Sequence, residues 1–143
     1  MTLYFYIKLY LATLAAFLVI DLIWLGLVAR GFYGRYLGFL MSPKPNWAAA
    51  ILFYLLFILG LLIFVVVPGL QAGSLPSDGF ATPGKAVLLG ALFGLFTYAT
   101  YDLTNLATIK DWPLIITIVD LVWGVILSSL VTWISFLVGR WLL

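Results

Sequence analysis

Four long apolar runs constrain the fold of this chain more than any other feature. They cover residues 9–29, 47–67, 86–109 and 114–138. A bilayer with a hydrocarbon core of about 30 Å needs about 20 apolar residues per spanning helix, so each run is long enough to cross it. The sequence therefore predicts an all-α integral membrane protein, with four transmembrane helices in one compact bundle that forms a single domain over residues 1–143.

The amino-acid composition supports this fold class and narrows the chemistry. Hydrophobic residues make up 66% of the 143 positions and charged residues only 8%, whereas an ordinary soluble domain has about a quarter charged residues. The formal charge of +2 is too small and too dispersed to indicate nucleic-acid binding. Because the chain has no cysteine and no histidine, thiolate and imidazole ligands are excluded, and no motif requires a metal or another cofactor.

The connections between the apolar runs differ in composition. Residues 30–46 mix basic with aromatic side chains, which predicts a short interfacial segment after the first helix. Pro68 and Gly69 are expected to end the second helix, and the loop that follows is rich in turn-forming residues. Residues 110–113 predict a tight hairpin in which Asp111 caps the fourth helix.

The basic residues suggest an orientation in the membrane. The first and third loops share one side of the predicted bundle, and cytoplasmic loops carry an excess of Lys and Arg. We therefore expect these two loops to be cytoplasmic and both termini to lie outside. The basic residues of the two loops are Arg30, Arg35, Lys44 and Lys110.

Three aspartates are predicted to lie at one depth in the bilayer. Asp102 lies eight residues before Lys110, and Asp120 lies nine residues after Asp111. At about 1.5 Å of rise per residue, both sit roughly 12 to 14 Å in from the hairpin, side by side on antiparallel helices. Asp21 lies nine residues before the basic residue that marks the same membrane face. The three carboxyl groups are therefore expected to converge, and we name them the carboxyl layer.

Each of these aspartates opens a similar four-residue motif, with leucine second and an indole or amide fourth. The motifs are Asp21-Leu-Ile-Trp24, Asp102-Leu-Thr-Asn105 and Asp120-Leu-Val-Trp123. In a helix the fourth residue lies one turn from the first and on the same face. The spacing therefore predicts that each carboxylate pairs with the indole or amide of its own helix.

The same motifs carry a resemblance to a known family. They are joined by Tyr101 before the second motif, Trp112-Pro113 after it, and Gly124 after the third. With this pattern the chain resembles an uncharacterised bacterial family of small membrane proteins catalogued as domain of unknown function 2177. The resemblance covers essentially the whole chain. It implies a multi-pass protein of the bacterial inner (cytoplasmic) membrane with four helices, and it supplies no activity.

Three functions remain open at this point. The first is the binding or chemical conversion of a lipid-soluble small molecule by acid/base chemistry, since two carboxyl groups in different environments can divide the roles of acid and base. The second is a proton- or cation-coupled transporter that works as a homodimer. The third is a structural or assembly subunit in which the polar residues only join helices.

The first of these functions assigns roles to particular residues. The candidate catalytic groups are the three carboxyl groups of the carboxyl layer. An apolar cleft open to lipid is predicted beside them, lined by aromatic rings, with one amide at its edge. The candidate ligand-binding residues are Trp24, Tyr98, Tyr101, Asn105 and Trp123.

Overall fold

The computed structural model describes residues 1–72 and 82–143, and within these residues all regular structure is helical. The elements are α1 (Leu3–Trp24), the π-helical turn η1 (Leu25–Ala29), α2 (Arg30–Leu37), α3 (Trp47–Leu61), the π-helical turn η2 (Leu62–Val66), α4 (Val67–Ala72), α5 (Pro83–Thr108) and α6 (Leu114–Leu142).

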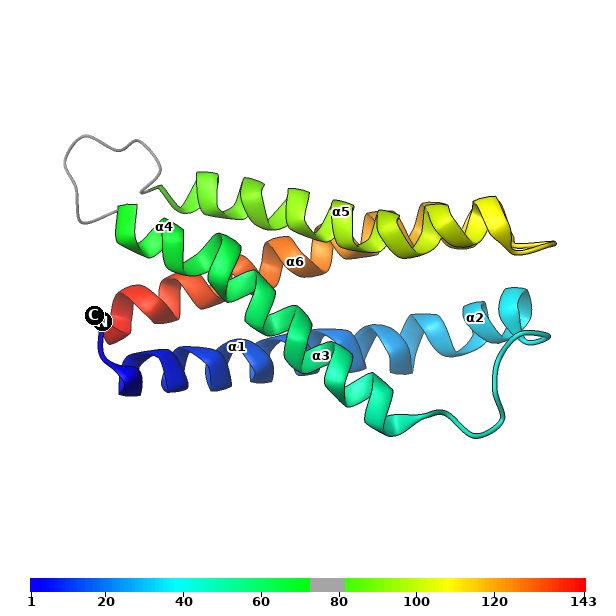
Figure 1. Cartoon of the computed structure of the whole chain (residues 1–143), viewed down its shortest axis with the longest axis horizontal. Coiled ribbons are helices and arrows are strands. Elements are labelled where there is room, and N and C mark those ends of the chain that lie inside the picture. The colour runs from blue at the N-terminus through cyan, green and yellow to red at the C-terminus, as the bar shows by residue number, and fades with distance from the viewer. Residues whose placement is uncertain (73–81) are drawn as a thin grey trace.

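These elements form four long rods that pack together. Figure 1 shows α1 running into α2, α3 crossing the bundle diagonally into α4, and α5 lying along α6. In the described part of the chain, four helical stretches are long and apolar enough to cross a membrane: Leu3–Leu37, Trp47–Ala72, Pro83–Thr108 and Leu114–Leu142. The predicted fold class, an all-α bundle of four membrane-spanning helices, is therefore confirmed.

Side-chain caps define where three of the rods begin. The hydroxyl of Thr2 accepts a hydrogen bond from the backbone N–H of Phe5 at 3.3 Å. The amide oxygen of Asn46 and the hydroxyl of Thr82 cap α3 and α5 in the same way, at 3.1 Å and 3.4 Å. Each cap satisfies one of the backbone donors that a helix start leaves unpaired. Polar residues just before the apolar runs therefore fix these helix boundaries.

The second rod is longer than the sequence suggested, and the expected break at Pro68 and Gly69 is wrong. Helix α4 continues through both residues to Ala72. The helical turn that contains Gly69 is closely packed against its neighbours: a Cβ on Gly69 would lie 3.4 Å from the Phe136 ring and 3.5 Å from Ala86. The remainder of the predicted loop, residues 73–81, lies outside the described residues.

Two further expectations about the connections need correction. Residues Arg30–Leu37 do not form a separate segment but continue the first rod as α2, so only residues 38–46 link it to α3. Asp111 does not cap the fourth helix, because α6 begins at Leu114 after Pro113 with no side-chain cap. Asp111 instead adopts a left-handed backbone conformation, with φ of 60°, which a short polar side chain tolerates and which reverses the chain.

Helices α5 and α6 make the most extensive contact in the described bundle. Glycines allow this close approach. A Cβ on Gly94 would overlap the carbonyl oxygen of Gly124 and the hydroxyl of Ser128, and one on Gly90 would overlap the Thr132 side chain. The small residues at this interface therefore bring the two backbones together, as in other membrane helix pairs.

The bundle interior holds an apolar cluster at one end, interspersed with buried hydroxyl groups such as those of Ser128 and Thr132, and buried aspartates toward the other end. Along α1 the buried residues are Phe5, Leu9, Thr13, Phe17 and Asp21, in that order. The apolar residues pack against others from η2, α4 and the second half of α6, near the end where the two chain termini meet in Figure 1. Asp21 lies toward the other end, where α2 and the α5–α6 hairpin are found.

A substitution at the glycine contact tests this packing. We expect Gly94→Ala to lower the free energy of unfolding by about 1 to 3 kcal/mol, because the added methyl group has no space against α6. The measurement is reversible unfolding of the purified protein in mixed micelles with increasing dodecyl sulfate. Gly26→Ala is the matched control, since a Cβ there would meet nothing within 4 Å. Equal unfolding midpoints for the two variants would contradict the packing argument.

Candidate functional site

Asp21 is the best-satisfied member of the carboxyl layer. It is 6% exposed and accepts two hydrogen bonds from other helices. The Tyr54 hydroxyl donates to Oδ2 at 3.1 Å, and the Trp123 indole N–H donates to Oδ1 at 3.4 Å. Asp21 therefore joins α1 to α3 and to α6 in the interior of the bundle.

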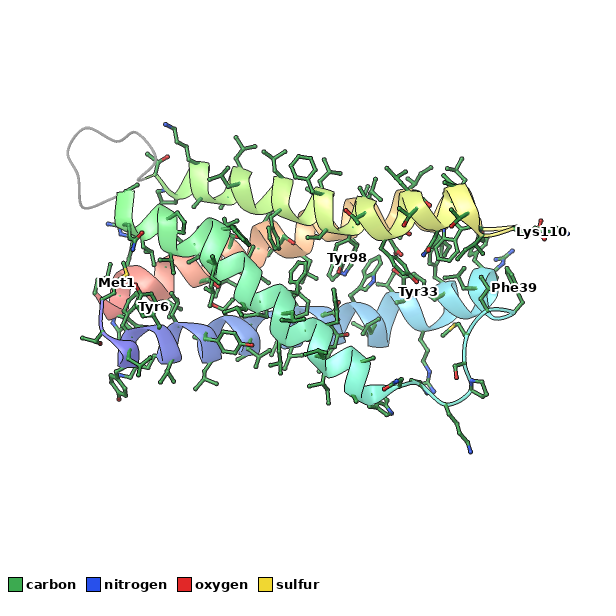
Figure 2. The ribbon with its side chains drawn as sticks, in the orientation of Figure 1. Met1, Tyr6, Tyr33, Phe39, Tyr98 and Lys110 are labelled. Atoms are coloured by element: carbon green, nitrogen blue, oxygen red, sulfur yellow. The ribbon has the colours of Figure 1, made fainter. Side chains whose placement is uncertain are left out.

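Asp120 on α6 is held by a single tyrosine. Its side chain is 8% exposed, and its Oδ1 accepts a hydrogen bond from the Tyr33 hydroxyl on α2. Tyr33 had only been expected to lie at the membrane interface. Figure 2 shows this tyrosine directed into the space between α2 and α5, as is Tyr98 from the opposite side. The structure thus adds Tyr33 to the site.

Asp102 on α5 has the most unusual environment of the three. It is 0% exposed, and neither of its carboxyl oxygens has a hydrogen-bond partner. Its backbone carbonyl is approached by the Thr117 hydroxyl at 3.5 Å, while its carboxyl group interacts with that of Asp120 across the α5–α6 contact. A fully buried carboxyl group without a donor is rare, because burial without a hydrogen bond is costly.

The predicted pairing within each helix is wrong. Trp123 donates to Asp21 on α1 rather than to Asp120 on its own helix. Trp24 makes no hydrogen bond of ordinary geometry, although its buried indole nitrogen interacts with the Tyr33 hydroxyl. Residues one turn apart share a face, but that face is turned toward a neighbouring helix. A donor on the neighbouring helix therefore reaches the carboxylate more directly.

Trp24, Trp123 and Asn105 were expected to line a ligand-binding cleft, and the structure places them elsewhere. Trp24 and Trp123 stack face to face, with ring centroids 4.3 Å apart and planes 10° apart. This stack joins α1 to α6. Asn105 is partly exposed near the end of α5, and its side chain makes no hydrogen bond with the residues described. None of these three lines the cavity described next.

A cavity of about 310 Å³ lies beside Asp102 and Asp120. Its lining residues are Phe53, Thr97, Tyr98, Tyr101, Asp102 and Asp120, and we name it the aromatic cavity. Phe53 and Tyr101 are 51% and 60% exposed, so they mark its mouth, whereas the two carboxyl groups form its buried end. Phe53 was not among the predicted residues, because nothing in an apolar helix distinguishes a ring at a cavity mouth from one facing lipid.

The π-helical turn η1 explains how Tyr33 reaches this site. Tyr33 lies twelve positions after Asp21, which in an uninterrupted α-helix places the two residues about 120° apart around the axis. A single π-helical turn takes in about one extra residue, so the angle falls to about 20°. Tyr33 therefore shares the inward face of the first rod with Asp21, and it points at Asp120.

The groups that act on the three carboxyl groups are tyrosine, tryptophan and other aspartates, and none is lysine or arginine in the described ranges. No group of three or more Asp, Glu, His or Cys residues close enough to hold a metal ion occurs in residues 1–72 and 82–143. The site thus combines acidic groups with neutral donors and aromatic rings.

The fold and this site define a class: a multi-pass membrane protein of four helices with carboxyl groups buried between them. The chain belongs to the family described as Predicted membrane protein (DUF2177), whose model matches residues 6–137. Comparisons with curated proteins and with solved structures give no match. The family description supports the membrane location and assigns no activity.

The role of η1 in positioning Tyr33 predicts an unusual tolerance to deletion. Removing Val28 should turn η1 into an ordinary helical turn and leave Tyr33 facing Asp120, because only the extra residue is lost. Since the chain has no cysteine, Tyr33→Cys and Asp120→Cys can be joined by a short bifunctional thiol reagent to report this proximity. We expect cross-linking within about twofold of that in the full-length chain.

A deletion outside a π-helical turn provides the control for this experiment. Removing Ala15, in the regular part of α1, should rotate one half of the first rod against the other by about 100°, and cross-linking should be largely lost. If the Val28 deletion abolished cross-linking as completely as the Ala15 deletion, η1 would not hold the extra residue.

Proposed function

We propose that this protein binds a lipid-soluble small molecule in the aromatic cavity and exchanges a proton with it through Asp102 and Asp120. The observation that carries this proposal is the Asp102 carboxyl group, which is fully buried, has no hydrogen-bond donor, and lies at the inner end of a cavity. Ionisable residues inside a membrane are costly and are retained mainly where they have a function.

The position of the cavity supports entry from the lipid phase. Its mouth is bordered by Phe53 on α3 and Tyr101 on α5, two rings that are largely exposed on the side of the bundle. The second rod contacts α5 chiefly through η2 and α4, further toward the termini. The bundle is therefore less closely packed beside the carboxyl groups than at its apolar end, and a hydrophobic molecule has a lateral path.

The two carboxyl groups have different partners, which suits a division of roles. Asp120 accepts a hydrogen bond from Tyr33, whereas Asp102 has no donor. Carboxyl groups in unlike environments can serve as acid and base in one reaction. Asp21 takes a supporting role, because both of its oxygens are used by Tyr54 and Trp123.

A second candidate function, a coupled carrier, is favoured by one observation. Both η1 and η2 interrupt the regular hydrogen bonding of a membrane-spanning rod, although neither resembles the Gly/Pro breaks of transporter helices. π-Helical turns are frequent at functional sites, and interrupted helices surround the substrate sites of many carriers. Such a carrier would work as a homodimer, with the carboxyl layer exchanging protons for substrate.

The family description gives a membrane location, and the distribution of basic residues supports a proposal for the orientation. We propose the bacterial inner membrane, with the loop between α2 and α3 and the α5–α6 hairpin on the cytoplasmic side. The support is the set of basic residues near that end of the bundle: Arg30, Arg35, Lys44 and Lys110. A homodimer or another partner in the bilayer is compatible with this arrangement.

The function can be tested by lipid and small-molecule mass spectrometry on the purified protein. We expect a compound to copurify with the natural chain and to fall at least about tenfold in Asp102→Asn and Asp120→Asn, which keep the side-chain size and remove the acid. The same compound, or its product, should change in the lipids of a deletion strain. Proton-gradient-dependent uptake into vesicles would instead favour the carrier.

The matched control is Asp111→Asn, which removes the same charge in the hairpin, away from the aromatic cavity. It should retain the copurifying compound. If both Asp102→Asn and Asp120→Asn restored the deletion strain fully and bound the same compounds as the natural chain, the site would be structural only.

A further inference from the structure

We propose that the ligand of the aromatic cavity is an organic cation with an apolar body, such as a lipophilic amine or quaternary ammonium ion, whose charge lies against Asp102 and Asp120. This inference rests on the proposed function and names the chemical class of its ligand. It follows from the charges at the site, the chemistry of the cavity walls and the unpaired Asp102.

The charge balance at the site favours a cationic ligand. Two acidic side chains face each other at the buried end of the cavity, and their described partners include no lysine or arginine. Lys110, in the hairpin, lies eight positions from Asp102, and on α2 the side chains of Arg30 and Arg35 are exposed. Facing carboxylates in a medium of low dielectric repel each other strongly. A positive charge between them removes this repulsion.

Asp102 supplies a separate argument. The hydroxyl of Tyr33 donates to Asp120, and Tyr54 and Trp123 donate to Asp21, but no hydroxyl or N–H group of the described chain donates to Asp102, whose carboxyl group interacts with that of Asp120. The side chain nevertheless lines the cavity. A ligand with a positive charge or an N–H group would supply Asp102 with the ion pair or hydrogen bond that no hydroxyl or N–H group of the described chain provides.

The cavity walls favour an organic cation over an inorganic one. Hard metal cations take six or more oxygen ligands. Beyond the two carboxyl groups, the lining residues offer only the hydroxyl oxygens of Thr97, Tyr98 and Tyr101. The remaining walls are the rings of Phe53, Tyr98 and Tyr101. Aromatic faces attract organic cations and also accommodate their apolar groups.

The other large groove does not share this chemistry. A cavity of about 480 Å³ between α1 and η2 is lined by Tyr6, Ile7, Tyr10, Leu11, Leu59, Leu62, Ile63 and Val67. It has no acidic residue, and the Tyr10 hydroxyl is already bonded to the carbonyl of Leu55 at 3.0 Å. It therefore serves as an internal comparison: charge-selective binding is expected only at the aromatic cavity.

Binding of two ions of nearly equal shape and opposite charge tests the proposal. The full-length protein in nanodiscs of phosphatidylcholine is titrated with tetraphenylphosphonium and, separately, with tetraphenylborate. We expect saturable binding of the cation, at least about tenfold tighter than that of the anion, and loss of this preference in Asp102→Asn. Asp111→Asn should bind the cation as the natural chain does.

Variants at the cavity mouth keep the proposal testable if Asp102→Asn fails to fold. Tyr101 is 60% exposed, so its replacement should leave the bundle intact. Tyr101→Leu should weaken cation binding about threefold to tenfold, because it removes an aromatic face, while Tyr101→Phe should bind within about twofold of the natural chain. Equal effects of both substitutions would remove the aromatic part of the argument and count against the proposal.

The failure of this inference and that of the proposed function are distinguishable. If the anion bound as tightly as the cation, or if neither ion bound saturably, the ligand would not be an organic cation of this kind. The proposed function would still stand if a neutral compound copurified with the natural chain and was lost in Asp102→Asn. Both would be contradicted if the protein showed no preference between the two ions and if the aspartate variants copurified with the same compounds as the natural chain.

Discussion

The close contact between α5 and α6 determines the arrangement of the rest of the structure. Gly94 meets the backbone of Gly124 with no side chain between them, so the two helices have a single register from the hairpin to the far end. That register places Asp102 opposite Asp120. The first rod then packs mainly on α6, and the second rod contacts the first rod through α3 and the α5–α6 pair through η2 and α4. The cavity between α3 and α5 results from this order of packing.

The lipid environment explains how the carboxyl layer is satisfied. Water is absent from the hydrocarbon region, so each buried carboxyl group depends on donors supplied by the protein. Asp21 and Asp120 obtain theirs from helices other than their own, through Tyr54, Trp123 and Tyr33. These bonds connect the first rod to the second rod and to α6. Asp102 is the exception, because no hydroxyl or N–H group of the described chain donates to it and its carboxyl group interacts with that of Asp120.

The sequence predicted the three aspartates of the site, and the sequence-based predictions that were wrong have a common cause. The prediction that the three aspartates lie at one depth rests on their distance to the loops, because helical rise is nearly constant. The partners of these aspartates did not follow, because pairing within a helix and pairing between helices use the same spacing. Tyr33 was missed for a related reason: η1 changes the face on which it lies. No residue pattern in Leu25–Ala29 marks a π-helical turn, since its hydrogen bonds depend on packing.

The sequence by itself determined the class of the protein and the number of long helices. These properties depend on hydrophobicity and length, which are local and additive. Only the tertiary structure decided that Trp123 serves Asp21, that Tyr33 serves Asp120, and that Phe53 and Tyr101 border a cavity ending at Asp102. These properties depend on the rotation and crossing of each helix against its neighbours. Glycine contacts and π-helical turns set that geometry. Because they act through contacts between helices, the geometry cannot be read from any one position in the sequence.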